Sequence, residues 1–237
     1  MDKKCIKRKF SIKKAHEAQL CLFKRIVLQD KLPEKIRYVG GVDVAYAEDV
    51  SIGAVAVLDF DSLKLLESQA ASCKTRFPYI PTLLSFREIM PSVLCIRKLN
   101  VQPDVFLADG HGFAHPYRCG FASHLGLVIG KPTIGVAKSK LIGEVRSAFP
   151  EKDTAPISHN DEVIGAALTT KQGCKPVYVS VGHMVSLETA VKIVRHCATV
   201  NRIPEPILRA HEIATETKRK INILSANKTD SQGMINC

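Results

Sequence analysis

The sequence predicts one α/β domain built on a mixed sheet, in which an antiparallel three-strand meander is followed by parallel strands with flanking helices. Three short β-rich runs between residues 38 and 70 are joined by short polar connections, which is typical of antiparallel hairpins. A helical stretch then leads into a wholly apolar run at residues 105–108, as expected of a strand covered on both faces. The 237 residues, 46% of them hydrophobic, are enough for a single large core.

Residues 1–37 form a basic arm. They contain twelve Lys and Arg against four Asp and Glu, so the arm carries +8 of the chain's formal net charge of +11. A basic amphipathic helix packed on the domain is predicted for residues 11–28, with Ser11 as its N-cap and with Lys24 and Arg25 facing outward. The apolar positions near helical spacing are Ile12, Ala15, Leu22 and Ile26. Such an arm either faces nucleic acid or an anionic membrane surface, or is a solvated tail.

The first strand of the meander, residues 38–46, carries a carboxylate among apolar residues. With a period of two, Val42 and Val44 face one side of the sheet and Asp43 faces the other. Asp is depleted in strands, and an unpaired buried carboxylate is costly. Asp43 therefore needs a partner, which is either an Arg or Lys side chain or a metal ion. The second and third strands are predicted at residues 51–58 and 63–70.

A stiff, extended loop follows the meander at residues 76–82, because Pro78 and Pro81 leave it few conformations. Its Tyr79 either serves as a wedge or packs on the core.

A helix is predicted from Thr82, and Pro91 is expected to kink it or to start a second helix. The positions expected to face inward are Leu83, Phe86, Ile89 and Met90. Glu88 lies outside this apolar face, so the pattern predicts an exposed side chain there.

Charged side chains follow the next two strands directly. The strand at 105–108 runs into the sequence DGHG, which begins with Asp109, and the strand at 133–137 runs into Lys138 and Lys140. The helical crossover predicts parallel pairing of the strand at 105–108 with the first strand. Ligands of such sheets bind at the carboxyl ends of the strands. Asp109 and Lys138 are therefore predicted to point toward one rim.

The remaining elements are predicted behind this rim. A helix at residues 120–129 should end at Gly130. Strands are expected at 162–170 and 175–181, and a helix at 187–199 with Ser186 as its cap.

The final helix is predicted to begin near Pro204. Its inward positions are Ile207, Ala210, Ala214 and Ile221. His211 shares this face and is either a packed, hydrogen-bonded core histidine or a site residue. The tail, from about residue 225 to 237, is polar and is predicted to be frayed.

Several classes of protein are not expected. No apolar run approaches the roughly 20 residues that cross a bilayer, and the charged N-terminus lacks an apolar core, so neither a membrane span nor a secretory signal is predicted. The eight cysteines are scattered, without a Cys-x-x-Cys pair, which favours reduced thiols in the cytoplasm over a zinc site or a disulfide framework. With no repeat and no linker, residues 1–237 are predicted to form one domain, and nothing requires more than a monomer.

Carboxylates occur at Asp43 on the first strand, Glu88 on the first crossover helix and Asp109 after the fourth strand. This is the layout of the ribonuclease H-like nucleases, and a ribonuclease H-like mixed sheet is therefore the predicted fold. Carboxylates that converge at strand ends repel one another unless divalent cations lie between them, and hard cations prefer oxygen ligands. Two ions roughly 3.5–4 Å apart can activate a water and stabilise the leaving oxygen of a phosphodiester.

Several motifs occur in order along the chain. They are FPYIP at 77–81 with LSFRE at 84–88, DGHG at 109–112 with HP at 115–116 and ASHLG at 122–126, and PTIGVAK at 132–138. From about residue 11 to about residue 222, the chain closely resembles the endonuclease V family of deoxyinosine-specific repair nucleases. The resemblance implies that the second phosphodiester bond 3′ to a deaminated base in DNA is hydrolysed, leaving the base in place. It also implies Mg²⁺ as cofactor, with Mn²⁺ as a substitute, and products with 3′-OH and 5′-phosphate ends.

The resemblance assigns roles to matching positions. The implied metal ligands are Asp43, Glu88 and Asp109. The implied DNA-binding wedge is Pro78, Tyr79, Ile80 and Pro81, with Tyr79 parting the strands. The implied catalytic residues are Lys138 and His211 near the scissile phosphate, and His115 in the turn that supports the metal site and the flipped base. The implied wall of the base pocket is Leu84, Gly110, Gly120 and Leu141.

Two positions depart from the family pattern. Thr82 stands where the family usually has glycine, so the wedge loop is expected to sit slightly differently against DNA. Tyr117 stands where arginine is frequent, which leaves one expected phosphate contact open. Neither departure involves the carboxylates.

Other classes of function remain as alternatives. A ribonuclease of the same fold would use the same metals, and some relatives act on inosine in RNA, so inosine-containing RNA is a second candidate partner beside deoxyinosine DNA. A non-catalytic nucleic-acid-binding module would not need three carboxylates together with Lys138. A glycosylase would release a free base, and a small-molecule enzyme would not need the basic arm.

Overall fold

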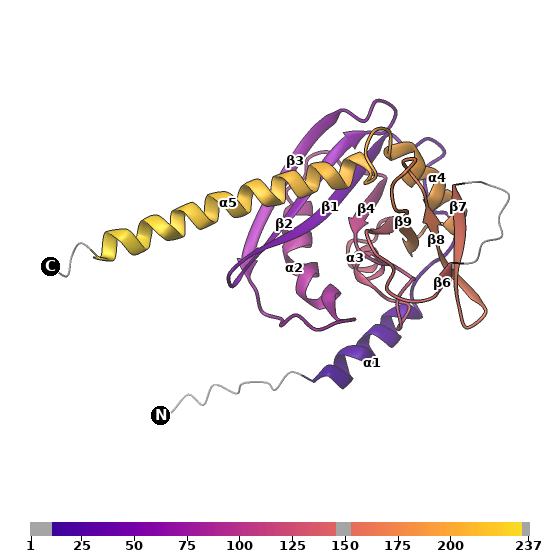
Figure 1. Cartoon of the computed structure of the whole chain (residues 1–237), viewed down its shortest axis with the longest axis horizontal. Coiled ribbons are helices and arrows are strands. Elements are labelled where there is room, and N and C mark those ends of the chain that lie inside the picture. Colours follow the sequence, from indigo (N-terminus) through magenta and orange to yellow (C-terminus); the bar gives the residue numbers. More distant parts are fainter. Residues whose placement is uncertain (1–10, 146–152, 234–237) are drawn as a thin grey trace.

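The computed structural model describes residues 11–145 and 153–233, with side chains as far as residue 224. Within these ranges a nine-stranded mixed sheet carries helices on both faces, and a long C-terminal helix extends beyond the sheet (Figure 1). The first ten residues of the predicted basic arm lie outside the described residues. They include Lys3, Lys4, Lys7, Arg8 and Lys9.

The sheet has the predicted order of an antiparallel meander followed by parallel strands. The strands are β1 (Tyr38–Ala47), β2 (Val50–Asp59), β3 (Leu65–Lys74), β4 (Val105–Asp109), β5 (Thr133–Ala137), β6 (Glu144–Val145), β7 (Thr154–His159), β8 (Glu162–Leu168) and β9 (Val177–His183). Their order across the sheet is β3-β2-β1-β4-β5-β9-β8-β7-β6. β1 pairs antiparallel with β2 and parallel with β4, which in turn pairs parallel with β5. The ribonuclease H-like fold class predicted from the sequence is confirmed.

Helices cover the sheet on two sides and create two hydrophobic cores. They are α1 (Ile12–Phe23), α2 (Leu84–Ile96), α3 (Phe121–Ile129), α4 (Leu187–Cys197) and α5 (Glu205–Gly233). α2 and α3 share one core with the sheet, in which Phe106 is almost completely buried. α4 and the first turns of α5 share the other, which includes Ile207. Complete burial of side chains of this size contributes about 1.5–3 kcal/mol each.

The close approach of α5 to β1 positions the candidate site. A Cβ atom at Gly41 would lie 1.8 Å from the carbonyl oxygen of Pro206, so only glycine lets the helix lie this near the strand. α5 then runs along β1 and brings His211 against Asp43, with 2.7 Å between His211 Nδ1 and Asp43 Oδ2.

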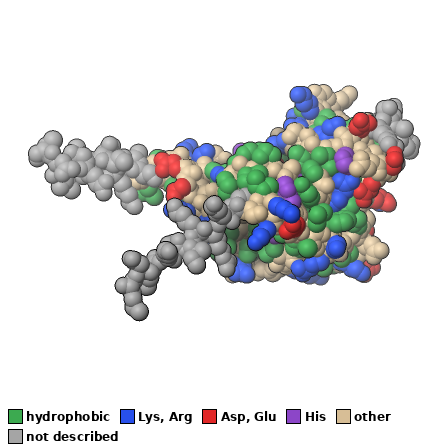
Figure 2. Space-filling view, turned by 90° about the horizontal axis from the view of Figure 1, so that it is seen from below, with side chains coloured by type: hydrophobic (Ala, Val, Ile, Leu, Met, Phe, Trp, Pro, Cys, Tyr) green, Lys and Arg blue, Asp and Glu red, His purple; other side chains and the backbone are tan. Residues whose placement is uncertain are grey.

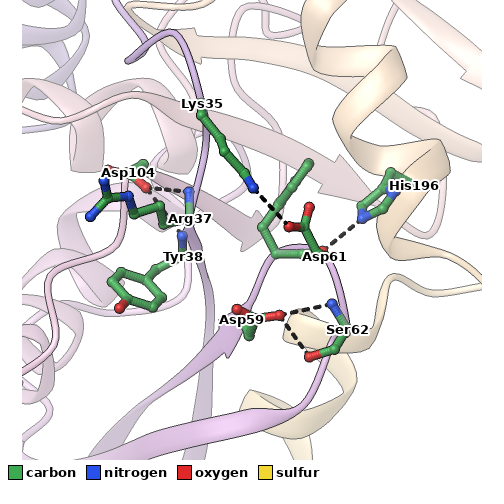
Figure 3. A network of polar contacts seen from close by, with 9 residues as sticks. Lys35, Arg37, Tyr38, Asp59, Asp61, Ser62, Asp104 and His196 are labelled. Carbon is green, nitrogen blue, oxygen red and sulfur yellow. Dashed lines mark hydrogen bonds and ion pairs between the residues drawn. The ribbon is translucent and has the colours of Figure 1, made fainter.

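A polar network at the start of β1 fixes how this strand pairs with β4 (Figure 3). The Asp104 carboxylate accepts hydrogen bonds from the backbone N–H groups of Arg37, at 2.7 Å, and Tyr38, at 3.1 Å. The Asp104 N–H in turn donates to the Tyr38 carbonyl at 2.9 Å. The resulting register aligns Val42 with Ala108. Asp43 and Asp109 each follow one member of that pair and therefore lie on neighbouring strands.

The N-terminal helix differs from its prediction. Ser11 is the N-cap, with its hydroxyl accepting from the Lys14 N–H, but the helix ends at Phe23 rather than near Leu28. Tertiary bonds redirect the chain there: the Val27 N–H donates to His183 Nδ1, and the Val27 carbonyl accepts from the Met184 N–H. The buried residues of the helix are Ala15 and Gln19, whereas Ile12 is half exposed. As predicted, Lys24 and Arg25 are exposed.

The third strand begins two residues later than predicted and extends to Lys74. Leu63 has a φ of +53° and lies in the turn, where its N–H donates to the Asp59 carbonyl. The pairing of Val50 with Lys74 carries the ladder past the predicted end at residue 70.

The first crossover helix is rotated from its predicted orientation. Pro91 lies inside α2 and does not end it, and Met90, predicted inward, is exposed. The backbone of Pro91 packs against β2 so closely that a Cβ at Gly53 would lie 2.2 Å from the Pro91 carbonyl oxygen. Contact at this point turns Glu88 toward the interior, where its exposed fraction is 7%.

Other boundaries differ by a few residues, and two strands were not predicted at all. β9 is shifted two residues beyond its predicted range, and α4 ends at Cys197 rather than at residue 199. Ser186 caps α4 and Gly130 ends α3 in the left-handed conformation, both as predicted. β6 and β7 fall in a stretch without periodic pattern. The backbone of α5 is helical to Gly233, beyond the predicted start of the tail near residue 225.

His124 is expected to make the stability of the fold depend on pH. This residue of α3 lies 3.2 Å, through Nδ1, from Ser85 Oγ, and burial lowers its pKa from 6.5 to about 4. The neutral form stabilises the fold fully above pH 6.5, and the contribution is lost as the pH falls through about 4. At about 1.36 kcal/mol per unit of pKa, the contribution is at most roughly 3 kcal/mol.

His124→Gln should therefore lose about 1–3 kcal/mol less stability than the wild type between pH 7 and pH 4. Urea unfolding curves at a series of pH values measure the difference between the two proteins. Parallel pH profiles would show that His124 does not contribute.

Candidate active site

Asp43 is the buried carboxylate of the central strand. Its exposed fraction is 9%, its Oδ1 accepts from the Val44 N–H at 2.8 Å, and its Oδ2 is hydrogen-bonded to His211 of α5. Burial raises the pKa of Asp43, and the negative charge of neighbouring Asp109 raises it further. Its hydrogen-bond partner is a histidine and not an Arg or Lys, while the other predicted partner, a metal ion, stays a prediction. His211 is hydrogen-bonded but more than half exposed.

Glu88 reaches the same region from α2. The Tyr46 hydroxyl, on β1, donates a hydrogen bond to Glu88 Oε1 at 3.1 Å, and the Arg87 guanidinium lies 4.1 Å from the centre of the Tyr46 ring. Burial, together with the negative charges of Asp43 and Asp109, raises the pKa of Glu88 to about 8. The predicted exposure of Glu88 was wrong, because a partner 42 residues earlier holds its carboxylate in the interior.

Asp109 and Lys138 meet at the carboxyl ends of β4 and β5, as predicted. Lys138 Nζ donates to Asp109 Oδ2 at 2.5 Å. The Lys138 backbone is held in turn by Arg202, whose guanidinium donates to the Lys138 carbonyl at 2.6 Å. The Lys138 side chain remains half exposed, so it places a positive charge beside Asp109.

The carboxylates have the chemistry of a divalent-cation site. Asp43 of β1 and Asp109 of β4 lie near enough to Glu88 of α2 for their charges to raise its pKa, and a dication would offset that repulsion. In the described ranges 11–145 and 153–233, no three His, Cys, Asp or Glu side chains are arranged to hold an ion as they stand. The carboxylates of Asp43, Glu88 and Asp109 are hydrogen-bonded instead to other side chains. These partners are His211, Tyr46 and Lys138, respectively.

His115 lies in the turn after β4, where sequence analysis placed it. It is buried, its Nδ1 accepts from the Tyr117 N–H at 3.2 Å, and it also bonds to the Thr82 backbone. Burial lowers the pKa of His115 to about 4, so the imidazole is neutral at physiological pH. These contacts connect the turn to the loop before α2, which gives His115 a supporting position.

The loop at residues 77–81 presents its tip to solvent. Tyr79 is 71% exposed, and Pro78 and Pro81 are also exposed, while Ile80 is partly buried. At the start of the loop, the Phe77 ring stacks on Phe86, with 5.6 Å between the ring centres. The alternative in which Tyr79 packs on the core is therefore wrong.

The four residues predicted for the base pocket come from three parts of the chain. Gly110 and Gly120 belong to the turn between β4 and α3, where the Gly120 N–H donates to the Gly112 carbonyl at 3.0 Å. Leu84 is the first residue of α2, and Leu141, 43% exposed, follows β5. Their common role as a pocket wall stays a prediction.

Three further residues organise the site and were missed by sequence analysis. Tyr46 holds Glu88, and His16 and Gln19 of α1 bond to Thr82 at the end of the exposed loop. Their partners lie 42 to 66 residues away, so no local pattern could have revealed them. Of the apolar positions predicted to face inward on α1, only Ala15 is buried, beside Gln19, so the helical period identified this face only in part.

The surface on the side of α1 mixes apolar and cationic groups. Figure 2 shows hydrophobic side chains over much of this face, with histidine, lysine, arginine and acidic side chains among them. Exposed apolar residues of α1 include Ile12, Leu20 and Phe23. Among the helices of the described residues, none combines the length and hydrophobicity of a membrane span.

The chain is similar to known proteins over most of its length. The family profile described as Endonuclease V matches residues 21–212. Endonuclease V of Thermofilum pendens is 44% identical over 211 residues, which cover 89% of this chain and 90% of that protein.

Solved structures agree with this similarity. The crystal structure of Endonuclease V from Streptomyces avermitilis has a TM-score of 0.84 at 36% identity, covering 90% of this chain and 95% of that one. Endonuclease V from Ciona intestinalis, in complex with a 24mer DNA containing an inosine followed by a ribo-adenosine, has a TM-score of 0.80 at 34% identity, covering 89% and 98%. With the profile, the relatives and the fold in agreement, this chain belongs to the endonuclease V family.

Proposed function

We propose that this nuclease recognises deoxyinosine in DNA and hydrolyses the second phosphodiester bond on the 3′ side of the lesion, leaving the base in place. The products would carry 3′-OH and 5′-phosphate ends. The observation that supports the proposal most is the convergence of Asp43, Glu88 and Asp109, from three separate elements, beside Lys138 and His211. Perturbed pKa values of buried acidic groups cluster at sites that bind a cation or move a proton.

Asp43, Glu88 and Asp109 would hold the divalent cation, with Mg²⁺ as the physiological ion and Mn²⁺ as a substitute. A bound dication supplies Lewis-acid stabilisation of the charge that develops on the phosphate. The half-exposed Lys138 ammonium adds positive charge at the same rim. His211 binds Asp43 through Nδ1, which orients the ring and leaves its Nε2 side for a phosphate oxygen.

Inosine-containing RNA is a second candidate substrate. The Ciona intestinalis protein was crystallised with DNA in which a ribo-adenosine follows the inosine. Matched strands that differ only in the sugar of the inosine or of the following nucleotide separate the two substrates. Faster cleavage of the all-deoxy strand supports the proposal, and a clear preference for ribose would assign the protein to RNA.

We also expect the basic arm to add affinity without selectivity. Replacing Lys3, Lys4, Lys7, Arg8 and Lys9 with Gln should flatten the dependence of DNA affinity on salt, because each lost phosphate contact reduces the logarithmic slope by about 0.9. The preference for deoxyinosine over an undamaged duplex should not change. Binding titrations from low to moderate salt measure the slope, and an unchanged slope would show that the arm is a solvated tail.

The proposal places the enzyme in the cytoplasm as a monomer. Among the described residues, Cys21, Cys73, Cys95, Cys119, Cys174 and Cys197 are free thiols. Burial raises the pKa of Cys95, Cys119 and Cys197 to about 12, which keeps them protonated and unreactive.

A further inference from the structure

Thr82 has a backbone conformation that threonine rarely adopts. Its φ is +71°, in the left-handed region, which is unfavourable for a β-branched residue. It lies between the exposed loop at 77–81 and the first turn of α2. A strained residue persists only where its surroundings hold it in place. Because Thr82 joins the loop to α2, the same restraint fixes the direction of the loop relative to the helix.

Beside the bond of His115 to the Thr82 backbone, the restraint comes from the N-terminal helix. His16 Nε2 lies 3.2 Å from Thr82 Oγ1, and the Gln19 side-chain amide donates to the Thr82 carbonyl at 2.8 Å. Gln19 is completely buried and also donates to the Cys119 carbonyl at 3.0 Å. The side-chain hydroxyl and the backbone carbonyl of Thr82 are therefore both hydrogen-bonded to α1.

His16 is itself fixed by the turn after β4. Its Nδ1 lies 3.0 Å from the Tyr117 hydroxyl, and the two rings stack with 4.2 Å between their centres. In either neutral tautomer one ring nitrogen donates and the other accepts, so hydroxyls that can do both, at Tyr117 and Thr82, satisfy both nitrogens at once. His16 thus connects the turn of the candidate active site to the end of the exposed loop.

We propose that His16 is a positioning residue, which holds Thr82 in its left-handed conformation and thereby fixes the loop that carries Tyr79. The other end of the loop is held separately, by the stacking of Phe77 on Phe86 and by the Arg87 guanidinium, which donates to the Phe77 carbonyl at 3.2 Å. With both ends held, the tip is presented as a rigid unit, and little ordering remains to be done on binding. The consequence for catalysis rests on the proposed role of Tyr79 as the wedge.

The loop can be observed directly, without nucleic acid. Because the chain contains no tryptophan, Tyr79→Trp creates a single fluorescent indole at the exposed tip. In this background, His16→Ala should increase the fast component of the indole anisotropy decay, which reports local motion on the nanosecond timescale. Glu17→Ala, a change at the exposed neighbour on the same helix, should leave the decay unchanged.

Graded variants distinguish positioning from general destabilisation. His16→Gln keeps a donor and an acceptor and should behave closer to the wild type than His16→Ala does. Tyr117→Phe keeps the ring but removes the hydroxyl, so its effect on the decay should be intermediate. These milder changes still test the proposal if His16→Ala does not fold.

The functional readout is the ratio of duplex to single-strand cleavage rates in the otherwise wild-type protein. His16→Ala should lower this ratio roughly three- to tenfold, the effect of losing one or two hydrogen bonds. Thr82→Gly removes both the backbone strain and the hydroxyl. In that background, His16→Ala should change the ratio of cleavage rates by less than about twofold.

The outcomes separate this inference from the proposed function. If His16→Ala leaves the indole anisotropy decay unchanged, the positioning role is overturned. If His16→Ala does not fold, an unchanged decay in Tyr117→Phe overturns it. A lower cleavage ratio with an unchanged decay would also overturn it, because His16 would then act on the nucleic acid itself. A changed decay supports positioning even if Tyr79→Ala shows that the tip is not a wedge, in which case only the proposed role of Tyr79 fails.

Discussion

Cleavage of deoxyinosine DNA is expected to fall by roughly a thousandfold or more when either Asp43 or Asp109 is replaced by alanine. The cation that these carboxylates would hold stabilises phosphate charge by several kcal/mol, and this contribution is lost with either ligand. DNA affinity should be largely kept, because it comes mainly from phosphate contacts elsewhere. Single-turnover rates with Mg²⁺ and equilibrium binding titrations measure the two quantities separately.

The controls exclude a folding defect. Burial and the charge of Asp109 raise the pKa of Asp43, so its ionised form is unfavourable in the folded state. In Asp43→Ala this offsets part of the stability lost with the hydrogen bonds of Asp43 to Val44 and His211. Asp61→Ala removes a surface carboxylate in the β2–β3 turn, which pairs with Lys35 at 3.3 Å, and should cleave normally. Near wild-type cleavage by Asp43→Ala or Asp109→Ala would show that the replaced residue does not hold the metal.

Tyr79→Ala should reduce cleavage of duplex deoxyinosine DNA by about 5- to 150-fold, the equivalent of about 1–3 kcal/mol of base–aromatic stacking. An enzyme that inspects a base must first take it out of the duplex, at a cost of a few kcal/mol. An aromatic ring at a rigid, exposed tip can stack where the base was. Tyr79, 71% exposed between two anchored loop ends, has this position.

Single strands provide the matched substrate for this test. No partner strand has to be parted there, so the loss on single-stranded deoxyinosine should be much smaller. Tyr79→Phe keeps the ring and should retain most of the duplex activity. Equal losses on duplex and single strand would make Tyr79 a pocket residue and would end its interpretation as a wedge.

Local patterns in the sequence predicted most of the sheet and the rim of the site. The alternation around Asp43 and the apolar run before Asp109 identified β1 and β4, and the crossover helix predicted that they pair in parallel. Those two facts together place Asp43 and Asp109 on adjacent strands. Lys138 followed from the same argument at the end of β5 and does contact Asp109.

What the sequence could not predict depends on contacts between distant segments. The burial of Glu88 requires the Tyr46 hydroxyl and the close packing of Pro91 on β2. The early end of α1 results from bonds between residue 27 and the end of β9. The restraint of Thr82 by His16 combines three segments, none of which has a pattern that points to the others.

Nick mapping on a duplex that carries one deoxyinosine tests the central claim most directly. One strand is labelled at its 5′ end, the duplex is incubated with the protein and Mg²⁺, and the product is resolved to single nucleotides. The proposed function predicts a single nick at the second phosphodiester bond 3′ to deoxyinosine, with a 3′-OH end and the base still attached. Release of free hypoxanthine, a nick at another bond, or an intact strand would contradict it.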